Sequence, residues 1–221
     1  MTTLTSPETL RRIPLTVAIL AALMLGAAGL GTRAGLWHFS TGFAMLRWAA
    51  YLGLAAGGVA IAMFLFPRLR TGGLAVLLCA VLVGAMVAAV PLGLQKRARS
   101  VPVMNEVTTD PVKASPLQQK AYPDIHPLIV DAPPGGAFVT AKAVAQEMGW
   151  EIVREDPQAG TIAAVATTFW FGFKDDVEIR VSPQGNASRI DLRSRSRVGE
   201  GDVGANAKRI RGYLSRFNVR R

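Results

Sequence analysis

The first hundred residues alternate between long apolar runs and short basic segments. The apolar runs cover residues 13–31, 43–66 and 73–94. Each is close to or above the ~20 residues that a helix needs to cross a hydrocarbon core about 30 Å thick. The segments that join them, residues 32–42 and 67–72, are short, so consecutive helices must be antiparallel neighbours. The pattern predicts a three-helix transmembrane region over residues 1–99.

Two features of these runs bear on what the helices do. Small residues recur four apart in the second run, at Ala49, Gly53 and Gly57, which predicts close packing against another helix. The three runs contain no Asp, Glu, Lys or His, the groups on which proton and ion pathways through membranes depend. The sequence therefore favours an anchor over a transporter.

The second half of the chain is polar and changes its pattern at residue 135. Residues 100–134 are rich in Pro, Thr, Asp and Gln without a sustained period, which predicts an extended arm. Residues 135–148 have helical periodicity, and Asp202 is placed to cap a second helix. Between these helices, four segments with strand character occupy residues 150–155, 161–168, 173–181 and 188–198.

This order of elements predicts a membrane-anchored α+β protein. Residues 135–221 would form a two-layer domain in which two helices cover one face of a four-stranded antiparallel sheet, a helix-grip-like arrangement. Both helices are expected on the same face because the apolar residues of the strands alternate with charged ones.

The last hairpin has a register that its charges support. If Val181 lies opposite Ile190, the apolar residues share one face and opposite charges pair across the strands on the other. Lys174 then faces Arg197, which leaves Arg197 without an acidic residue directly across the hairpin. The three charge pairs in this register are Arg180 with Asp191, Glu178 with Arg193, and Asp176 with Arg195.

Two interpretations of this region stay open. In one, the charges are a solvated ladder with structural ion pairs, and Arg209 neutralises whichever of Asp175 and Asp176 lies inward near Ser196. The residues assigned to this structural role are Asp175, Asp176, Glu178, Arg180, Asp191 and Asp202. In the other, the arginines and the start of the last helix bind an anion or a lipid headgroup. The residues of this predicted binding set are Arg193, Arg195, Arg197, Arg209 and Asn206.

The aromatic segment Phe169-Trp170-Phe171 also has two interpretations. It can be the edge of the core between two strands, or a loop that contacts the membrane surface, where Trp is favoured.

Charge and composition exclude several classes of protein. The chain has 25 Lys and Arg against 15 Asp and Glu, but residues 1–100 account for nine of these bases and one of the acids. The basic excess therefore flanks the apolar runs and does not indicate nucleic acid binding. With one cysteine, Cys79, and two histidines, no metal site is expected, and no nucleotide-binding or nucleophile motif predicts a cofactor.

Several motifs of the polar half are similar to those of a known family. The chain over residues of about 101–218 resembles the bacterial and plastid family called domain of unknown function 1499. Val112 to Pro116 stand where that family usually has a pair of prolines. The resemblance implies no activity and carries over no catalytic residue. The motifs are Thr108-Thr109-Asp110, Tyr122 to Ile125, Gly149-Trp150, Phe173 to Val177, and Arg193 to Gly199 followed by Asp202, Gly204, Asn206 and Arg209-Ile210.

The function expected from these features is a non-enzymatic, membrane-anchored envelope module. It would bind membrane lipid, another envelope protein or a further anionic envelope component. The alternative is a membrane-anchored hydrolase or transferase that uses carboxylates from Asp110, Asp124 or the Asp175/Asp176 pair. The basic residues that flank the spans are almost equally divided between the two sides, so they leave both orientations open. A basic pair precedes the first span, which favours a multi-pass protein of the bacterial inner membrane with its polar domain in the periplasm.

Overall fold

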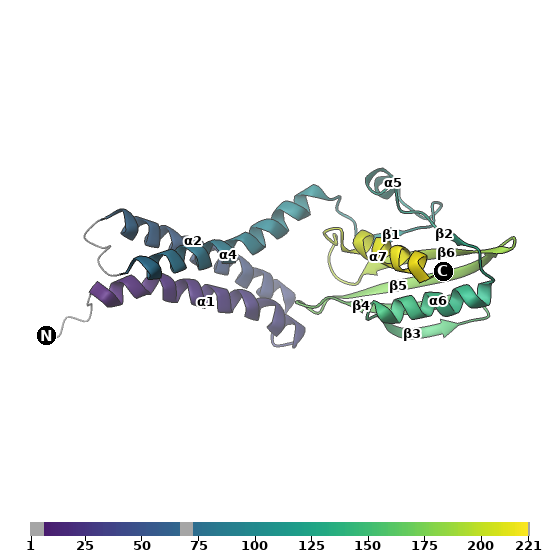
Figure 1. The fold of residues 1–221 in the computed structure, drawn as a ribbon, viewed down its shortest axis with the longest axis horizontal. Coiled ribbons are helices and arrows are strands. Elements are labelled where there is room, and N and C mark those ends of the chain that lie inside the picture. Colours follow the sequence, from purple (N-terminus) through teal and green to yellow (C-terminus); the bar gives the residue numbers. More distant parts are fainter. Residues whose placement is uncertain (1–6, 67–72, 221) are drawn as a thin grey trace. The chain divides into compact units, whose positions relative to one another are not determined.

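The computed structural model describes residues 7–66 and 73–220 (Figure 1). These residues fall into two compact units. The first unit contains the three long apolar helices up to Lys96, together with residues 170–172. The other runs from Arg97 onward and contains the sheet.

The helical unit consists of α1 (Pro7–Arg33), α2 (Phe39–Leu65) and α4 (Leu74–Ser100). Each contains a segment long and apolar enough to cross a membrane, namely Arg12–Arg33, Phe39–Leu65 and Leu74–Ser100. The prediction of three long apolar helices is confirmed. The predicted linker over residues 67–72 lies outside the described residues.

Small residues bring two of these helices into backbone contact. Ala49, Gly53 and Gly57 are buried on α2, and Gly53 faces Gly84 of α4. A Cβ atom on Gly53 would lie 2.8 Å from the carbonyl oxygen of Gly84, so a larger side chain does not fit. The close approach predicted from the four-residue spacing is therefore present.

The second unit contains the predicted helix–sheet–helix order. Gly149 follows the first helix with φ +72°, and Gly160 and Gly185 have φ +66° and +60° in the two hairpin turns, conformations that favour glycine. The six elements are α6 (Pro134–Glu147), β3 (Glu151–Asp156), β4 (Thr161–Thr167), β5 (Lys174–Gln184), β6 (Ala187–Ser196) and α7 (Ala205–Arg220).

The sheet has six strands where the sequence predicted four. The segment predicted as an extended arm supplies β1 (Glu106–Thr108) and β2 (Leu128–Val130), both antiparallel to β6, with the short helix α5 (Pro116–Ala121) between them. The strand order is β1-β6-β5-β4-β3, and β2 pairs with β6 beside β1. Strands of three residues are too short to show a two-residue period, which is why the pattern did not predict them.

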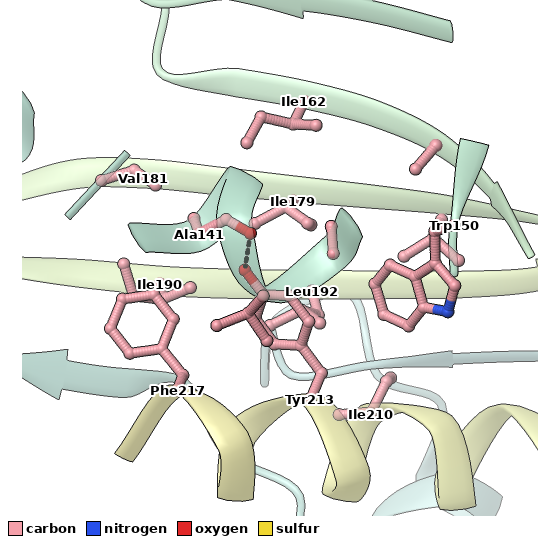
Figure 2. Packing of buried hydrophobic residues seen from close by; sticks show 14 of the residues in the cluster. Ala141, Trp150, Ile162, Ile179, Val181, Ile190, Leu192, Ile210, Tyr213 and Phe217 are labelled. Carbon is pink, nitrogen blue, oxygen red and sulfur yellow. Dashed lines mark hydrogen bonds between the residues drawn. The ribbon is translucent and has the colours of Figure 1, made fainter. Parts of the chain in front are cut away.

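One face of the sheet holds the core. The β5–β6 register pairs Val181 with Ile190 and Ile179 with Leu192, as predicted. These side chains pack against α7, and the Tyr213 hydroxyl donates to the Ala141 carbonyl of α6 at 2.9 Å (Figure 2). Burial raises the pKa of Tyr213. Both helices therefore cover the same face, and the side chains that alternate with the core residues lie on the opposite, open face.

Candidate functional site

The open face of the sheet contains a groove. Its volume is about 630 Å³, within the range of small-molecule sites. Strands β3 to β6 supply most of its lining, and the end of β1 with the segment after it supplies the rest. The lining residues are Thr108, Asp110, Lys113, Arg154, Thr161, Ile162, Ala163, Glu178, Ile179, Arg180, Ser182, Arg189, Asp191, Leu192 and Arg193.

The shape of the groove follows from side-chain size along the strands. On the open face of β4, the short residues Thr161 and Ala163 pair with Arg180 and Glu178 of β5. Ala163 also pairs with Arg154 of β3. Long side chains on the two neighbouring strands thus stand on either side of short ones, which leaves a hollow over β4.

The groove carries an excess of positive charge. Its lining has five basic residues and three acidic ones. Arg189 is paired on its own strand: its Nε and Nη2 donate to the two carboxylate oxygens of Asp191 at 2.7 and 2.8 Å. Lys113 is paired with Asp110, 3.7 Å away.

Arg193 is held mainly by a residue of β1. It donates to both carboxylate oxygens of Glu106 at 2.7 and 2.8 Å, and to Glu178 at 3.2 Å. The hydrogen bond from Arg193 lowers the pKa of Glu106, while the two carboxylates raise that of Arg193. Of the three predicted cross-strand ion pairs, this contact with Glu178 is the one that forms.

The other two predicted pairs have the right register but different partners. Arg180 lies opposite Asp191, but Arg189 binds that carboxylate. Asp176 lies opposite Arg195 but is bound by Arg197 at 2.6 Å, and this contact lowers the pKa of Asp176. Long arginine side chains reach diagonal and same-strand neighbours as easily as the residue directly opposite.

Arg154 and Arg180 are the two groove arginines for which the described residues provide no ion-pair partner. Within residues 7–66 and 73–220, neither guanidinium has a carboxylate within 4.0 Å, although both line the groove. Arg195 and Arg197, from the predicted binding set, share the open face but do not line the groove. Arg195 is 3.9 Å from Glu106.

The remaining two members of the predicted binding set lie on the covered face, in a buried polar cluster. Arg209 donates to Asp175 at 2.5 Å, to Asn206 at 2.6 Å and to Ser194 at 2.8 Å. Asn206 accepts from Ser194 at 2.7 Å and donates to Ser196 at 3.1 Å. The cluster ties α7 to β5 and β6.

The start of α7 is occupied by its own cap. The carboxylate of Asp202 accepts from the backbone N–H groups of Gly204 at 2.8 Å and Asn206 at 2.7 Å. The groups that would attract an external anion at a helix N-terminus are thus already hydrogen-bonded.

The aromatic segment is divided between the two units. Phe169 belongs to the sheet unit and is 84% exposed. Trp170 and Phe171 are grouped with the helices, where the Phe171 ring lies 5.2 Å from that of Phe43. Membrane contact by this segment stays a prediction.

The carboxylates considered for an enzyme each face a cation. Arg211 donates to both oxygens of Asp124 at 2.6 and 2.7 Å, which lowers the pKa of Asp124. Asp175 and Asp176 are bound by Arg209 and Arg197, and Asp110 is beside a lysine. The described residues include no group of three His, Cys, Asp or Glu side chains that could hold a metal ion.

Sequence reasoning missed part of the groove lining. The sequence pattern assigns Arg180 to an ion pair and does not indicate Arg154, Arg189 or Lys113. Strand alternation could have identified Arg189, two residues before Asp191. It could not identify Arg154, because a register shift between Ile152 and Arg154 reverses the alternation in β3.

These features define an α+β domain with an open, arginine-lined groove, in a chain with three candidate transmembrane helices that indicate a membrane protein. The model of a family described as protein of unknown function (DUF1499) matches residues 104–217, just over half of the 221 residues. The chain belongs to this family, and the resemblance seen in the sequence is confirmed. Comparison with curated proteins gives no match.

Proposed function

We propose that the protein is a non-enzymatic, membrane-anchored module whose groove binds an anionic component of the cell envelope. The observation that carries this proposal is the pair of groove arginines, Arg154 and Arg180, that have no carboxylate partner among the described residues. Uncompensated arginines in a concave surface attract anions.

The groove fits a small anionic group better than a protein surface. A specific protein interface buries about 800 Å² on each partner, whereas a volume of about 630 Å³ matches a headgroup or a metabolite. A hydrolase or transferase is disfavoured because Asp124, Asp175 and Asp176 are each held by an arginine.

The proposed location is the inner membrane of a bacterium, with a cytoplasmic N-terminus and a periplasmic sheet domain. The support is the basic pair Arg11-Arg12 ahead of the first of three spans. An alkaline phosphatase fused to the C-terminus should be active in intact cells. Activity of a C-terminal reporter in the cytoplasm alone would reverse the orientation.

Native mass spectrometry tests the binding function. The full-length protein is extracted from its own membrane in a neutral detergent, and bound species are measured by mass. We expect an anionic adduct that is lost in the Arg154→Gln/Arg180→Gln double variant. The adduct should persist in Arg195→Gln, a control on the same face and outside the groove. A wild-type protein without an adduct, or an adduct that the double variant keeps, would overturn the proposal.

A further inference from the structure

We infer that Arg154 and Arg180 together bind the phosphoryl group of a phosphate monoester whose remaining part is a hydroxylated body such as glycerol or a sugar. This inference rests on the proposed function and names the chemical class of the ligand. Three observations support it: the positions of the two arginines, the short side chains of β4 between them, and the nearly balanced charge of the rest of the groove.

The two arginines stand on either side of one strand. Arg154 pairs with Ala163 and Arg180 pairs with Thr161, two residues apart on β4. With strands about 4.8 Å apart and a rise of about 3.3 Å per residue, their Cα atoms are separated by about 12 Å. Two arginine side chains can close that distance around one tetrahedral anion above the short side chains of β4. Thr161 adds a hydroxyl donor at the floor.

The placement of Arg154 depends on an irregularity in β3. Glu151 pairs with Val165, and strict alternation from that point would put Arg154 on the covered face. The register shift between Ile152 and Arg154 instead pairs Arg154 with Ala163, on the open face. Val153, the residue within the shift, is 56% exposed. Bulges commonly re-aim a side chain at a functional site, and this one brings a second arginine to the groove.

The acidic residues nearest to these arginines are engaged elsewhere. Asp191, directly opposite Arg180, is held by two hydrogen bonds from Arg189, and Glu178 accepts from Arg193. Asp156, which pairs with Thr161 from the other side, accepts from the backbone N–H groups of Gln158 and Ala159 at 3.0 and 2.9 Å. Both guanidinium groups therefore keep their hydrogen-bond donors for the ligand. Their planar forks suit a phosphate monoester, which carries up to two charges and three acceptor oxygens.

The end of the groove formed by β6 and the segment after β1, beside Arg180, carries little net charge. There Arg189 pairs with Asp191, and Lys113 with Asp110, so the charges nearly cancel. Their carboxylate oxygens keep lone pairs that can accept hydrogen bonds from hydroxyl groups. A ligand that matches both ends has a charged phosphoryl group and a neutral, hydroxylated body.

Calorimetry on the full-length protein in a neutral detergent and a phosphate-free buffer tests this assignment. The probes are glycerol 3-phosphate, glycerol and dioctanoyl phosphatidic acid, whose headgroup is also a phosphate monoester. We expect binding of at least one phosphorylated probe and none of glycerol. Arg154→Gln and Arg180→Gln should each weaken binding at least tenfold, and Arg180→Lys should weaken it less than Arg180→Gln. The control Arg195→Gln should stay within twofold of wild type.

The three probes distinguish a lipid headgroup from a soluble phosphate ester. Together with the mass-spectrometric experiment they also distinguish failure of the phosphoryl assignment from failure of the proposed function. Tighter binding of phosphatidic acid assigns the site to a lipid headgroup, and tighter binding of glycerol 3-phosphate assigns it to a soluble ester; both support the inference. The inference is overturned if neither probe binds, or if Arg154→Gln and Arg180→Gln bind like the control. If the protein still carries an arginine-dependent adduct from its own membrane, and that adduct lacks phosphorus, the proposed function stands and the phosphoryl assignment alone fails.

Discussion

Replacing Arg209 with methionine should destabilise the sheet domain more than any exposed arginine would. Arg209 is the cation of the buried cluster, with 11% of its side chain exposed against 5% for Asp175. Methionine fills most of the same volume but leaves the carboxylate of Asp175 and the hydroxyl of Ser194 without their donor. Breaking one side of a buried ion pair costs about 3–5 kcal/mol, because the other charge stays uncompensated.

Hydrogen exchange read by mass spectrometry measures this loss in the domain itself. A cost of about 3–5 kcal/mol corresponds to exchange between roughly one hundred and a few thousand times faster in peptides from β5, β6 and α7. The matched control is Arg216→Met on the same helix, because Arg216 is exposed and its hydrogen bond runs to the Gly212 carbonyl. This control should change stability by less than about 0.5 kcal/mol.

A second variant separates the charge from the packing. Asp175→Asn removes the stranded charge, so the Asp175→Asn/Arg209→Met double variant should lose less stability than the sum of the two single variants. Additive losses, or an Arg209→Met variant no less stable than Arg216→Met, would show that the cluster is not an ion pair that holds α7 to the sheet.

Three further results are expected. Tyr122→Phe should stabilise the domain by up to about 1 kcal/mol in chemical denaturation, because the buried hydroxyl has no hydrogen-bond partner among the described residues; a loss of stability would reveal a hidden partner. Gly84→Leu should lower the thermal midpoint in detergent by overpacking against α2, at a cost of about 1–3 kcal/mol, whereas Gly93→Leu, with open space around it, should not. Hydrogen bonds from arginines lower the pKa values of Glu106 and Asp124, so their stabilisation is present at neutral pH and is lost as the pH falls through the lowered values. Loss of stability in an acid titration should therefore begin below the ordinary pKa values of 4.5 for Glu106 and 3.8 for Asp124; greater stability at pH 3 than at pH 7 would contradict this.

The sequence predicted the elements whose patterns are long. The three apolar runs and the 11- and 10-residue strands β5 and β6 repeat their pattern often enough to determine type, face and register. The strands β1 and β2 have three residues each, and their pairing with β6 is set by contacts distant in the chain. One such contact is the side chain of Gln118, which bonds the backbone N–H and C=O of Thr108 at 3.0 and 2.6 Å. No local period reports a contact of that kind.

The candidate site was harder to predict than the fold because register does not decide which charges meet. In the β5–β6 hairpin the pairing of Arg180 with Asp191 is right at the backbone, yet Arg189 binds both oxygens of that carboxylate from two residues away. A guanidinium at the end of a long side chain can reach several carboxylates on one face, and which ion pair forms depends on the positions of all the neighbouring charges. Because Arg189 binds Asp191 and Arg193 contacts Glu178, Arg180 has no carboxylate partner among the described residues. The residue assigned from sequence to a structural pair thus becomes one of the two residues on which the proposed ligand depends.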